Sequence, residues 1–321
     1  MRHPATCANE APLRRRSYTL VELLLVIAII TMLIGLSVSA LFQFVTGQHE
    51  KNTKFMMTQL NGALNKHWTA VAQTAAKENW STPDNANALP LIKQWAGNDD
   101  NRARVMYVKF RLKQEFPTTF DEALNPYPLP PKPTYKAYLA KLGITGSSPA
   151  TAPYESSVCL YMALTLSTGG TQFKADQLGL AVREFDAPSG KIKGFTDDWN
   201  NPLVFARWPW GDPNLQNLAP TVLNTPPAGP VSAMLDKDDP DGRLVDANWQ
   251  ANYPQGLAAF QQYAHPVVNP ANGFAYYLIP VLVSAGRDNN LGINGGDFAT
   301  LKVSNPSAAG DNIYSYNLGR N

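Results

Sequence analysis

The sequence predicts an α+β fold in which one long N-terminal α-helix packs on a small antiparallel β-sheet head, with a helical, proline-rich insertion between helix and sheet. Two observations predict the helix. No charged side chain occurs from Leu23 to Gln48, and apolar residues then recur at three- and four-residue steps as far as position 79. Short apolar runs separated by turn residues begin near Lys191 and predict the sheet. We expect the first half of the helix to span a membrane.

The N-terminal segment joins a cluster of arginines to a long apolar run. Arg14, Arg15 and Arg16 precede a stretch in which Glu22 is the only acidic residue before Gln48. A helix of this length crosses a bilayer core of about 30 Å at about 1.5 Å per residue. Because basic flanks stay in the cytoplasm, we expect a single-pass protein with a cytoplasmic N-terminus.

Glu22 is the most informative residue of this segment, since a carboxylate in a membrane helix is costly and is usually kept for a function with a partner group. The run from Ser17 to Glu22, Ser-Tyr-Thr-Leu-Val-Glu, together with the preceding arginines, resembles the N-terminus of the type IV pilin and type II secretion pseudopilin superfamily. Ser17 stands where this family usually has Gly. Ser39 stands where a helix-breaking Pro is common, which favours a continuous helix.

The resemblance implies processing followed by assembly. A prepilin peptidase/methyltransferase would cut between Ser17 and Tyr18, remove residues 1–17 as a leader, and methylate the new N-terminal amine of Tyr18. In a filament, Glu22 would neutralise the N-terminal amine of a neighbouring subunit, a pairing that makes both charges tolerable in lipid-like surroundings. Residues 18–45 would form the transmembrane and filament-core helix.

Two plainer interpretations of this segment stay open. A secretory signal has a short apolar core and a small-x-small cleavage site, and Val38-Ser39-Ala40 fits such a site. The apolar run here is longer than such a core and contains Glu22, which favours the pilin-like interpretation. An unprocessed membrane anchor is the other alternative.

Composition limits the classes of function. The 321-residue chain has a formal net charge of +2, and without the leader it is nearly neutral, so nucleic acid is not an expected partner. Cys7 lies in the leader, which leaves Cys159 as the one cysteine of the mature chain, expected to be a small buried apolar residue. His49, His67 and His265 are scattered, and no hydrolase or phosphate-binding motif occurs, so the chain is not expected to be an enzyme.

Residues 46–79 predict an amphipathic continuation of the helix, with a stripe of apolar residues from Met56 to Ala75. We expect a single helix from Thr19 to about Glu78. Two helices broken near Gly47 are the alternative.

The pattern of apolar residues and prolines over residues 80–190 predicts a helical, proline-rich insertion. The prolines from Pro117 to Pro153 predict an extended segment that lies on the surface rather than in the core. Helices are expected within 80–98, over Asp99–Glu115, at a turn capped by Thr119, over Tyr135–Leu142 and over Glu155–Leu166.

Residues 191–321 predict the β-rich head. A turn from Asp197 to Pro202 leads into a strand candidate over Leu203–Trp208, and Ala275–Ser284 is the best strand candidate of the chain. The acidic segment Asp236–Arg243 superficially resembles an EF-hand loop. Pro240 occupies a ligand position there and no closing Glu follows, so a solvated acidic turn is favoured over a cation site.

The C-terminal loop offers hard oxygen ligands beside glycines that allow sharp turns, a setting that suits Ca²⁺. The order of turn, strand, Ser-x-Gly-x-Asp and late Asp resembles the C-terminal region of major type II secretion pseudopilins. That resemblance implies a loop calcium. A metal-free loop whose Asp and Asn residues cap turns is the alternative. The candidate calcium ligands are Ser284, Asp288 and Asp311, the carbonyl of Leu282, and, more weakly, Asn290 and Asp297.

The sequence as a whole favours a pilin-like structural subunit of a type II secretion pseudopilus, held in the inner membrane with a periplasmic C-terminal domain. Its expected partners are the prepilin peptidase/methyltransferase, other pilin-like subunits, the inner-membrane assembly platform and membrane lipid. A type IV pilus subunit is an alternative of the same class. A membrane-tethered periplasmic binding protein is an alternative of another class.

Overall fold

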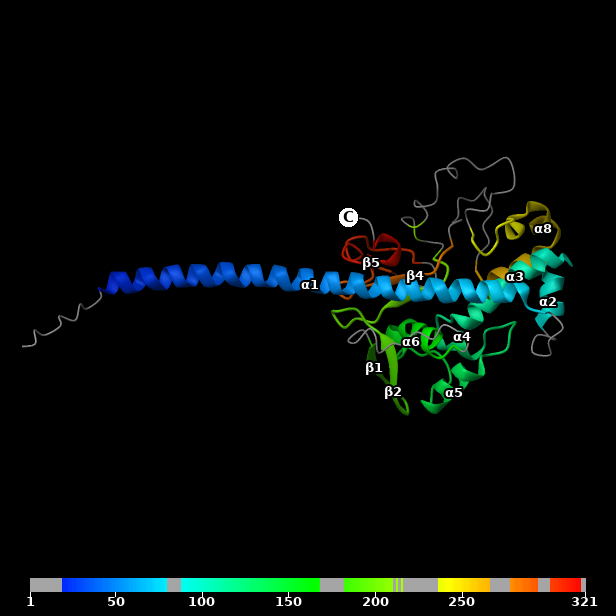
Figure 1. The fold of residues 1–321 in the computed structure, drawn as a ribbon, viewed down its shortest axis with the longest axis horizontal. Helices are drawn as coiled ribbons and strands as arrows, with labels where there is room; N and C mark the ends of the chain where they lie inside the picture. Colours follow the sequence, from blue (N-terminus) through cyan, green and yellow to red (C-terminus); the bar gives the residue numbers. More distant parts are fainter. Residues whose placement is uncertain are drawn as a thin grey trace, which may run out of the picture. The chain divides into compact units, whose positions relative to one another are not determined.

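The computed structural model describes residues 19–79, 88–167, 182–209, 212, 215, 236–265, 278–293 and 301–318, with the backbone alone for residues 39–46. The chain divides into two units, residues 1–48 and residues 49–321. Each unit is described by itself. Figure 1 shows the elements along the chain.

Helix α1 (Leu20–Lys77) is one continuous helix, as the sequence predicts. It begins directly after Thr19 and is not interrupted at Gly47. The alternative of two separate helices is therefore wrong. Its first part belongs to the unit of residues 1–48, and its remainder belongs to the unit of residues 49–321.

The described residues of the unit 49–321 form helices and two small antiparallel sheets, which confirms the mixed α+β class. Strands β1 and β2 form a hairpin, and β3, β4 and β5 form a three-stranded sheet in that order. The helices are α2 (Ala88–Trp95), α3 (Asp100–Glu115), α4 (Phe120–Leu124), α5 (Pro133–Lys141), α6 (Ala152–Thr165), the 3₁₀ helix η4 (Arg243–Val245), α8 (Ala247–Asn252), α9 (Pro254–Tyr263) and the 3₁₀ helix η7 (Ser315–Asn317). The strands are β1 (Val182–Ala187), β2 (Gly190–Phe195), β3 (Val204–Ala206), β4 (Val281–Ser284) and β5 (Ile313–Tyr314).

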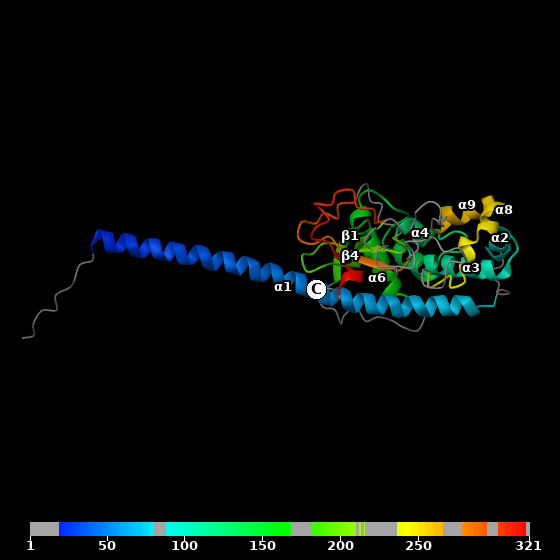
Figure 2. The same ribbon diagram turned by 90° about the horizontal axis from the view of Figure 1, so that it is seen from above.

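The apolar stripe of α1 forms one wall of the largest core cluster. Met57, Leu60 and Leu64 are fully buried and belong to the same core cluster as side chains of α2, α3 and α6. Trp68 stacks on Phe116, with their ring centroids 5.1 Å apart. Figure 2 shows this part of α1 running along one side of the unit. The sequence periodicity of residues 46–79 therefore marks a packing face.

The proline-rich segment between Pro117 and Pro153 is not confined to the surface, so that expectation is wrong. Phe120, Tyr135 and Leu139 are fully buried in a second core cluster, together with Cys159. Proline at the first turn of a helix needs no amide hydrogen-bond partner, so Pro133 starts α5 instead of excluding it. Cys159 has the expected buried position, and burial raises the pKa of its thiol.

Two boundaries in the C-terminal half differ from the expected ones. Strand β1 starts at Val182, inside the segment expected to be an insertion. Helices α8 and α9 lie in the segment expected to be β-rich, where Asp246 caps α8 through the amide of Asn248 and Pro254 opens α9. Each helix is short, so the sequence carries too few turns for a clear 3.6-residue period.

A partly buried ion pair joins Glu122 of α4 to Arg207, the residue that follows β3. Glu122 accepts hydrogen bonds from Arg207 at 2.8 and 2.9 Å, and from the amide and hydroxyl of Thr118 at 2.8 and 2.9 Å. Burial opposes the charge on Glu122, but Arg207 outweighs burial and lowers the pKa of this carboxyl to about 2. The carboxylate is therefore part of the folded state at neutral pH.

Glu122→Gln is expected to lower the free energy of unfolding at pH 7 by roughly 3 kcal/mol, the equivalent of this pKa depression. A depressed folded-state pKa contributes stability above the unfolded value near 4.5, and this contribution is lost as the pH falls through about 2. Urea unfolding of both proteins over this range should show the difference shrinking with acid. A difference that does not change with pH would contradict the assignment.

Candidate functional site

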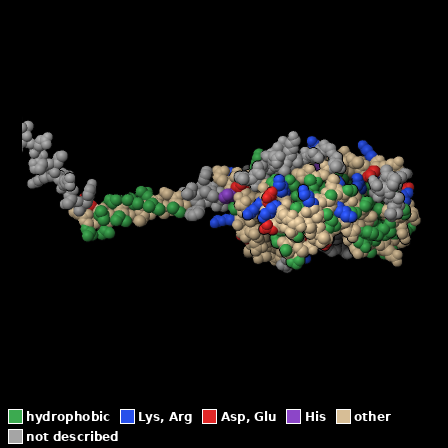
Figure 3. All heavy atoms as spheres, turned by 90° about the horizontal axis from the view of Figure 1, so that it is seen from below, with side chains coloured by type: hydrophobic (Ala, Val, Ile, Leu, Met, Phe, Trp, Pro, Cys, Tyr) green, Lys and Arg blue, Asp and Glu red, His purple; other side chains and the backbone are tan. Residues whose placement is uncertain are grey.

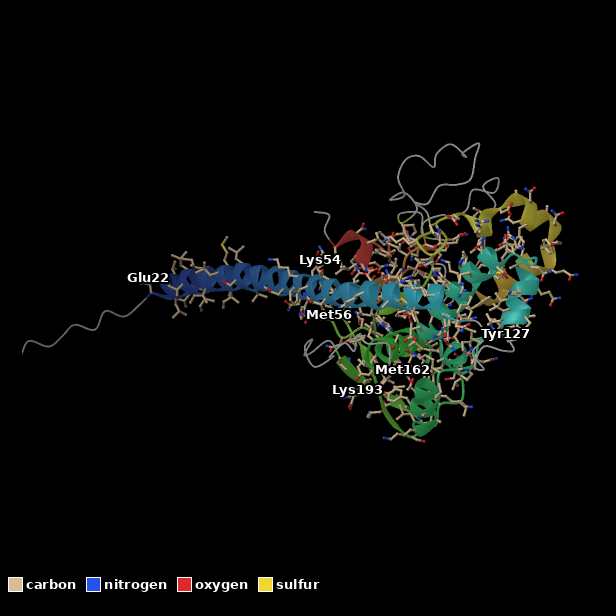
Figure 4. All side chains as sticks on the ribbon, turned by 45° about the vertical axis from the view of Figure 1, so that its right-hand side comes forward. Glu22, Lys54, Met56, Tyr127, Met162 and Lys193 are labelled. Atoms are coloured by element: carbon tan, nitrogen blue, oxygen red, sulfur yellow. The ribbon has the colours of Figure 1, made fainter. Side chains whose placement is uncertain are left out.

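The start of α1 is closed by a reciprocal cap between Thr19 and Glu22. The Glu22 Oε2 atom accepts the Thr19 amide at 2.9 Å and the Thr19 hydroxyl at 3.1 Å. The Glu22 amide donates to the Thr19 hydroxyl oxygen at 3.2 Å. This is the capping box that a Thr-x-x-Glu sequence favours. Figure 4 labels Glu22 at this end of the helix.

The helix beyond this cap is apolar on every side. Leu20–Val38 has a mean hydropathy of 2.7, no part of it is buried, and its length and composition suit a membrane span. It is the single such helix in the described part of the chain. The hydroxyls of Thr31 and Ser37 donate to the carbonyls of Ala28 and Leu33, so both are satisfied within the helix, as hydrocarbon requires. Figure 3 shows the hydrophobic side chains of this segment.

These observations place an acidic side chain at the first turn of an exposed apolar helix. Thr19 gives Glu22 neutral hydrogen-bond donors but no positive charge. The predicted cleavage pair, Ser17 and Tyr18, lies outside the described residues. The segment therefore carries a carboxylate, Glu22, that requires a neighbouring cation when it is enclosed in apolar surroundings.

The C-terminal loop brings Asp288 and Asp311 together. The Asp311 Oδ2 atom accepts the amides of Arg287 at 2.9 Å and Asp288 at 3.3 Å, and the Asp288 Oδ1 atom accepts the Asn290 amide at 2.8 Å. Gly286 has a positive φ of 67°, and a Cβ there would lie 2.5 Å from the Asp311 carbonyl oxygen. The loop therefore depends on glycine for this close approach.

Ser284 joins the start of this loop to a different aspartate: its hydroxyl oxygen accepts the Gly286 amide at 3.1 Å. Its hydroxyl donates to the Asp197 Oδ2 atom at 2.7 Å, and the Leu282 amide donates to the Ser315 hydroxyl at 3.0 Å. Asp197 also accepts the amides of Trp199 and Asn201, so it is the centre of the turn before β3. The sequence shows this turn but not its contact with Ser284.

Calcium remains a prediction for this loop. Within the described ranges, no group of three or more His, Cys, Asp or Glu side chains is placed to hold a metal ion. Asp288 and Asp311 would supply carboxylate oxygens, and in this structure both cap turns. Asp297, the weaker candidate, lies outside the described residues.

Calcium chloride is expected to raise the melting temperature of the full chain relative to the same sample with EDTA. An ion that binds the folded loop alone stabilises it by about 2.7 kcal/mol at a hundredfold excess over its Kd. Asp311→Asn keeps an acceptor for the two loop amides but removes the charge, so it should abolish the calcium response. An unchanged melting temperature in the unmodified protein would remove the calcium hypothesis.

The acidic segment at 236–243 is solvated only in part, because Asp236, Asp238 and Asp239 are held by contacts within the protein while Asp241 is exposed. Asp236 and Asp238 lie 2.7 and 3.2 Å from the Nζ atom of the fully buried Lys109. Asp239 accepts the amides of Arg243 and Leu244 at 2.8 Å. No local pattern around this segment indicates the lysine, because Lys109 lies on α3, more than a hundred residues earlier.

The histidines take packing and pairing positions. His67 is buried, with its Nε2 atom 3.0 Å from the Glu115 Oε1 atom, and His49 Nδ1 lies 2.5 Å from Asp198 Oδ2. His265 is also buried and contacts the Trp208 ring.

Comparisons with protein-family models, curated proteins and solved structures found no match to this chain. The functional interpretation therefore depends on the chain's own residues. They define an α+β protein with one N-terminal helix long and apolar enough to span a membrane.

Proposed function

We propose that this chain is a pilin-like subunit of a type II secretion pseudopilus and that it assembles through its N-terminal helix after removal of residues 1–17. One observation carries the proposal: Glu22 lies at the first turn of the fully exposed apolar helix Leu20–Val38. Capping alone explains an acceptor at this position, but an uncharged one such as Gln would serve a plain anchor, whereas a carboxylate in a membrane helix costs free energy.

The physical role of Glu22 follows from its surroundings. When copies of the helix leave the bilayer and bundle, their apolar surfaces cover one another and exclude water. A carboxylate in that bundle is tolerable only beside a positive charge. The N-terminal amine created by cleavage before Tyr18 would supply that charge from a neighbouring copy.

The rest of the fold supports this proposal. One helix, α1, carries an exposed apolar part and a part packed on an α+β unit, which is the division expected of a filament core and a surface head. The protein would act by assembly, without catalysis. Its partners would be the processing peptidase, other pilin-like subunits, the inner-membrane assembly platform and lipid. The arginines at 14–16 would hold the N-terminus in the cytoplasm, with the head in the periplasm.

The intact mass of the membrane-extracted protein tests the processing step. Loss of residues 1–17 with one added methyl group on Tyr18 is the expected result. Protein from cells that lack the prepilin peptidase should retain the full chain. A full-length chain from normal cells, or one that begins after Ala40, would overturn the proposal and favour an anchored or secreted binding protein.

A further inference from the structure

Strand β1 has an outer edge with no strand partner among the described residues. It pairs with β2 through a two-residue loop, with Ala187 opposite Gly190. In such a hairpin the pair beside the loop exchanges both backbone hydrogen bonds, and alternate residues then turn their amides and carbonyls outward. Val182, Glu184 and Asp186 are those outward residues.

A side-chain contact agrees with this assignment. The Tyr154 hydroxyl donates to the Asp186 carbonyl at 2.6 Å from outside the hairpin. The carbonyl of Asp186 is therefore occupied. Among the described residues, the amide of Asp186 and both backbone groups of Glu184 have no such contact and define the edge.

A groove follows this edge. Its volume is about 700 Å³, and β1, the start of α6 and the turn at Asn200–Pro202 line it. The rings of Tyr154 and Phe185 stack within it, with centroids 4.8 Å apart and planes inclined by 12°. The edge thus combines backbone hydrogen-bonding groups with an aromatic surface.

The two faces of β1 carry different charges: Arg183, on the face of Phe185, donates to the Asn200 carbonyl at 3.2 Å, and the other face is acidic. Glu184 and Asp186 project from one face, and across the hairpin they oppose Lys193 and Lys191. Figure 4 labels Lys193 on this hairpin. Suppose that a second copy paired with this edge. Glu184 and Asp186 of one copy would then lie opposite the acids of the other copy, or Asp186 would lie opposite Val182. Like charges directly opposite are destabilising.

We propose that the outer edge of β1 binds an extended segment of a partner protein that has basic residues at alternate positions and apolar residues between them. The basic side chains of the added segment would lie beside Glu184 and Asp186. Charge would then alternate from strand to strand, with lysines on β2, acids on β1 and basic residues on the partner. The apolar residues would lie on the face of Phe185, against the aromatic pair. This is strand addition, in which backbone hydrogen bonds give affinity and alternate side chains give specificity. The proposal does not depend on the function proposed above.

The test is fluorescence anisotropy of labelled peptides with the full chain in detergent. Thr-Lys-Val-Lys-Val-Lys-Thr is expected to bind at least tenfold more tightly than Thr-Glu-Val-Glu-Val-Glu-Thr. Equal binding of the two peptides, or no binding of the first, would overturn the proposal.

Two variants of Glu184 separate the backbone contribution from the charge. Glu184→Pro removes an outward amide that β2 does not use, a position where an edge strand tolerates proline, and should weaken binding at least tenfold. Glu184→Lys keeps the amide and should shift the preference toward the acidic peptide. Unchanged binding by Glu184→Pro with an unchanged melting temperature would refute strand addition. If that variant unfolds, an unshifted preference of Glu184→Lys is the contradicting result.

Discussion

Glu22→Ala is expected to abolish incorporation of the chain into filaments, while the leader is still cleaved and the unit of residues 49–321 stays folded. Under our proposal the variant leaves the amine of the neighbouring copy without an anion inside an apolar bundle. An unpaired buried charge costs about 3–5 kcal/mol, which is a loss of more than a hundredfold in the assembly equilibrium. The measurement is the amount of the chain in sheared filaments relative to the membrane fraction.

Because Glu22 also caps α1, two further variants are needed to separate the cap from the charge. Thr19→Val removes the hydroxyl from the cap and costs about 1 kcal/mol of helix stability, but it keeps the carboxylate, so filaments should still form. Glu22→Gln keeps a polar side chain without the charge and should fail to assemble. Normal filaments from Glu22→Ala would count decisively against the assembly proposal.

Lys109→Met is expected to lower the free energy of unfolding by about 3–5 kcal/mol, the cost of breaking a buried ion pair from one side. Lys109 is fully buried, its Nζ atom contacts Asp236 and Asp238, and it lies 5.4 Å from the centre of the Trp208 ring. Methionine has a similar length and fills the same space. The carboxylates would then be left without their cation. Urea unfolding followed by tryptophan fluorescence measures the loss.

A rescue variant and the pH dependence check the cause of this loss. Adding Asp236→Asn and Asp238→Asn to Lys109→Met should recover part of the stability, because no unpaired charge is then left. Burial alone would lower the pKa of Lys109, but the two carboxylates outweigh it and raise that pKa. A raised pKa gives stability that is complete at neutral pH and lost as the pH rises past the lysine range. If the two asparagine substitutions do not change the loss in free energy of unfolding, the ion-pair explanation is contradicted.

The parts of the fold that the sequence predicted well are those with local signals. The continuous helix over residues 20–77 was expected from its apolar residues. A helix was expected to begin at Asp99, and α3 begins at Asp100 with the Asp99 side chain accepting two amides as its cap. Thr119 caps α4 in the same way. Caps and periodic stripes depend on neighbours within a few residues, so they can be read before the tertiary structure is known.

The parts that could not be predicted depend on distant partners. Nothing near Lys109 in the sequence indicates that Asp236 and Asp238 will contact it, and nothing near Ser284 indicates Asp197. Proline content also does not distinguish a surface segment from a buried one, since Tyr135 is fully buried within the proline-rich segment. At the candidate site, Glu22 was found from the sequence, whereas its partner Thr19 was missed although the Thr-x-x-Glu pattern was present.

The attachment of α1 to the unit of residues 49–321 has a mechanical consequence. His49, Asn52 and Thr53 all bond to Asp198, and five turns further along the helix His67 contacts Glu115. Between these two attachments the apolar stripe is buried along its length. A pull along the helix axis therefore loads both attachments and the stripe at once, in shear, instead of opening them one after another as peeling would. We expect the unit to resist extraction of its helix far better than it resists a sideways pull.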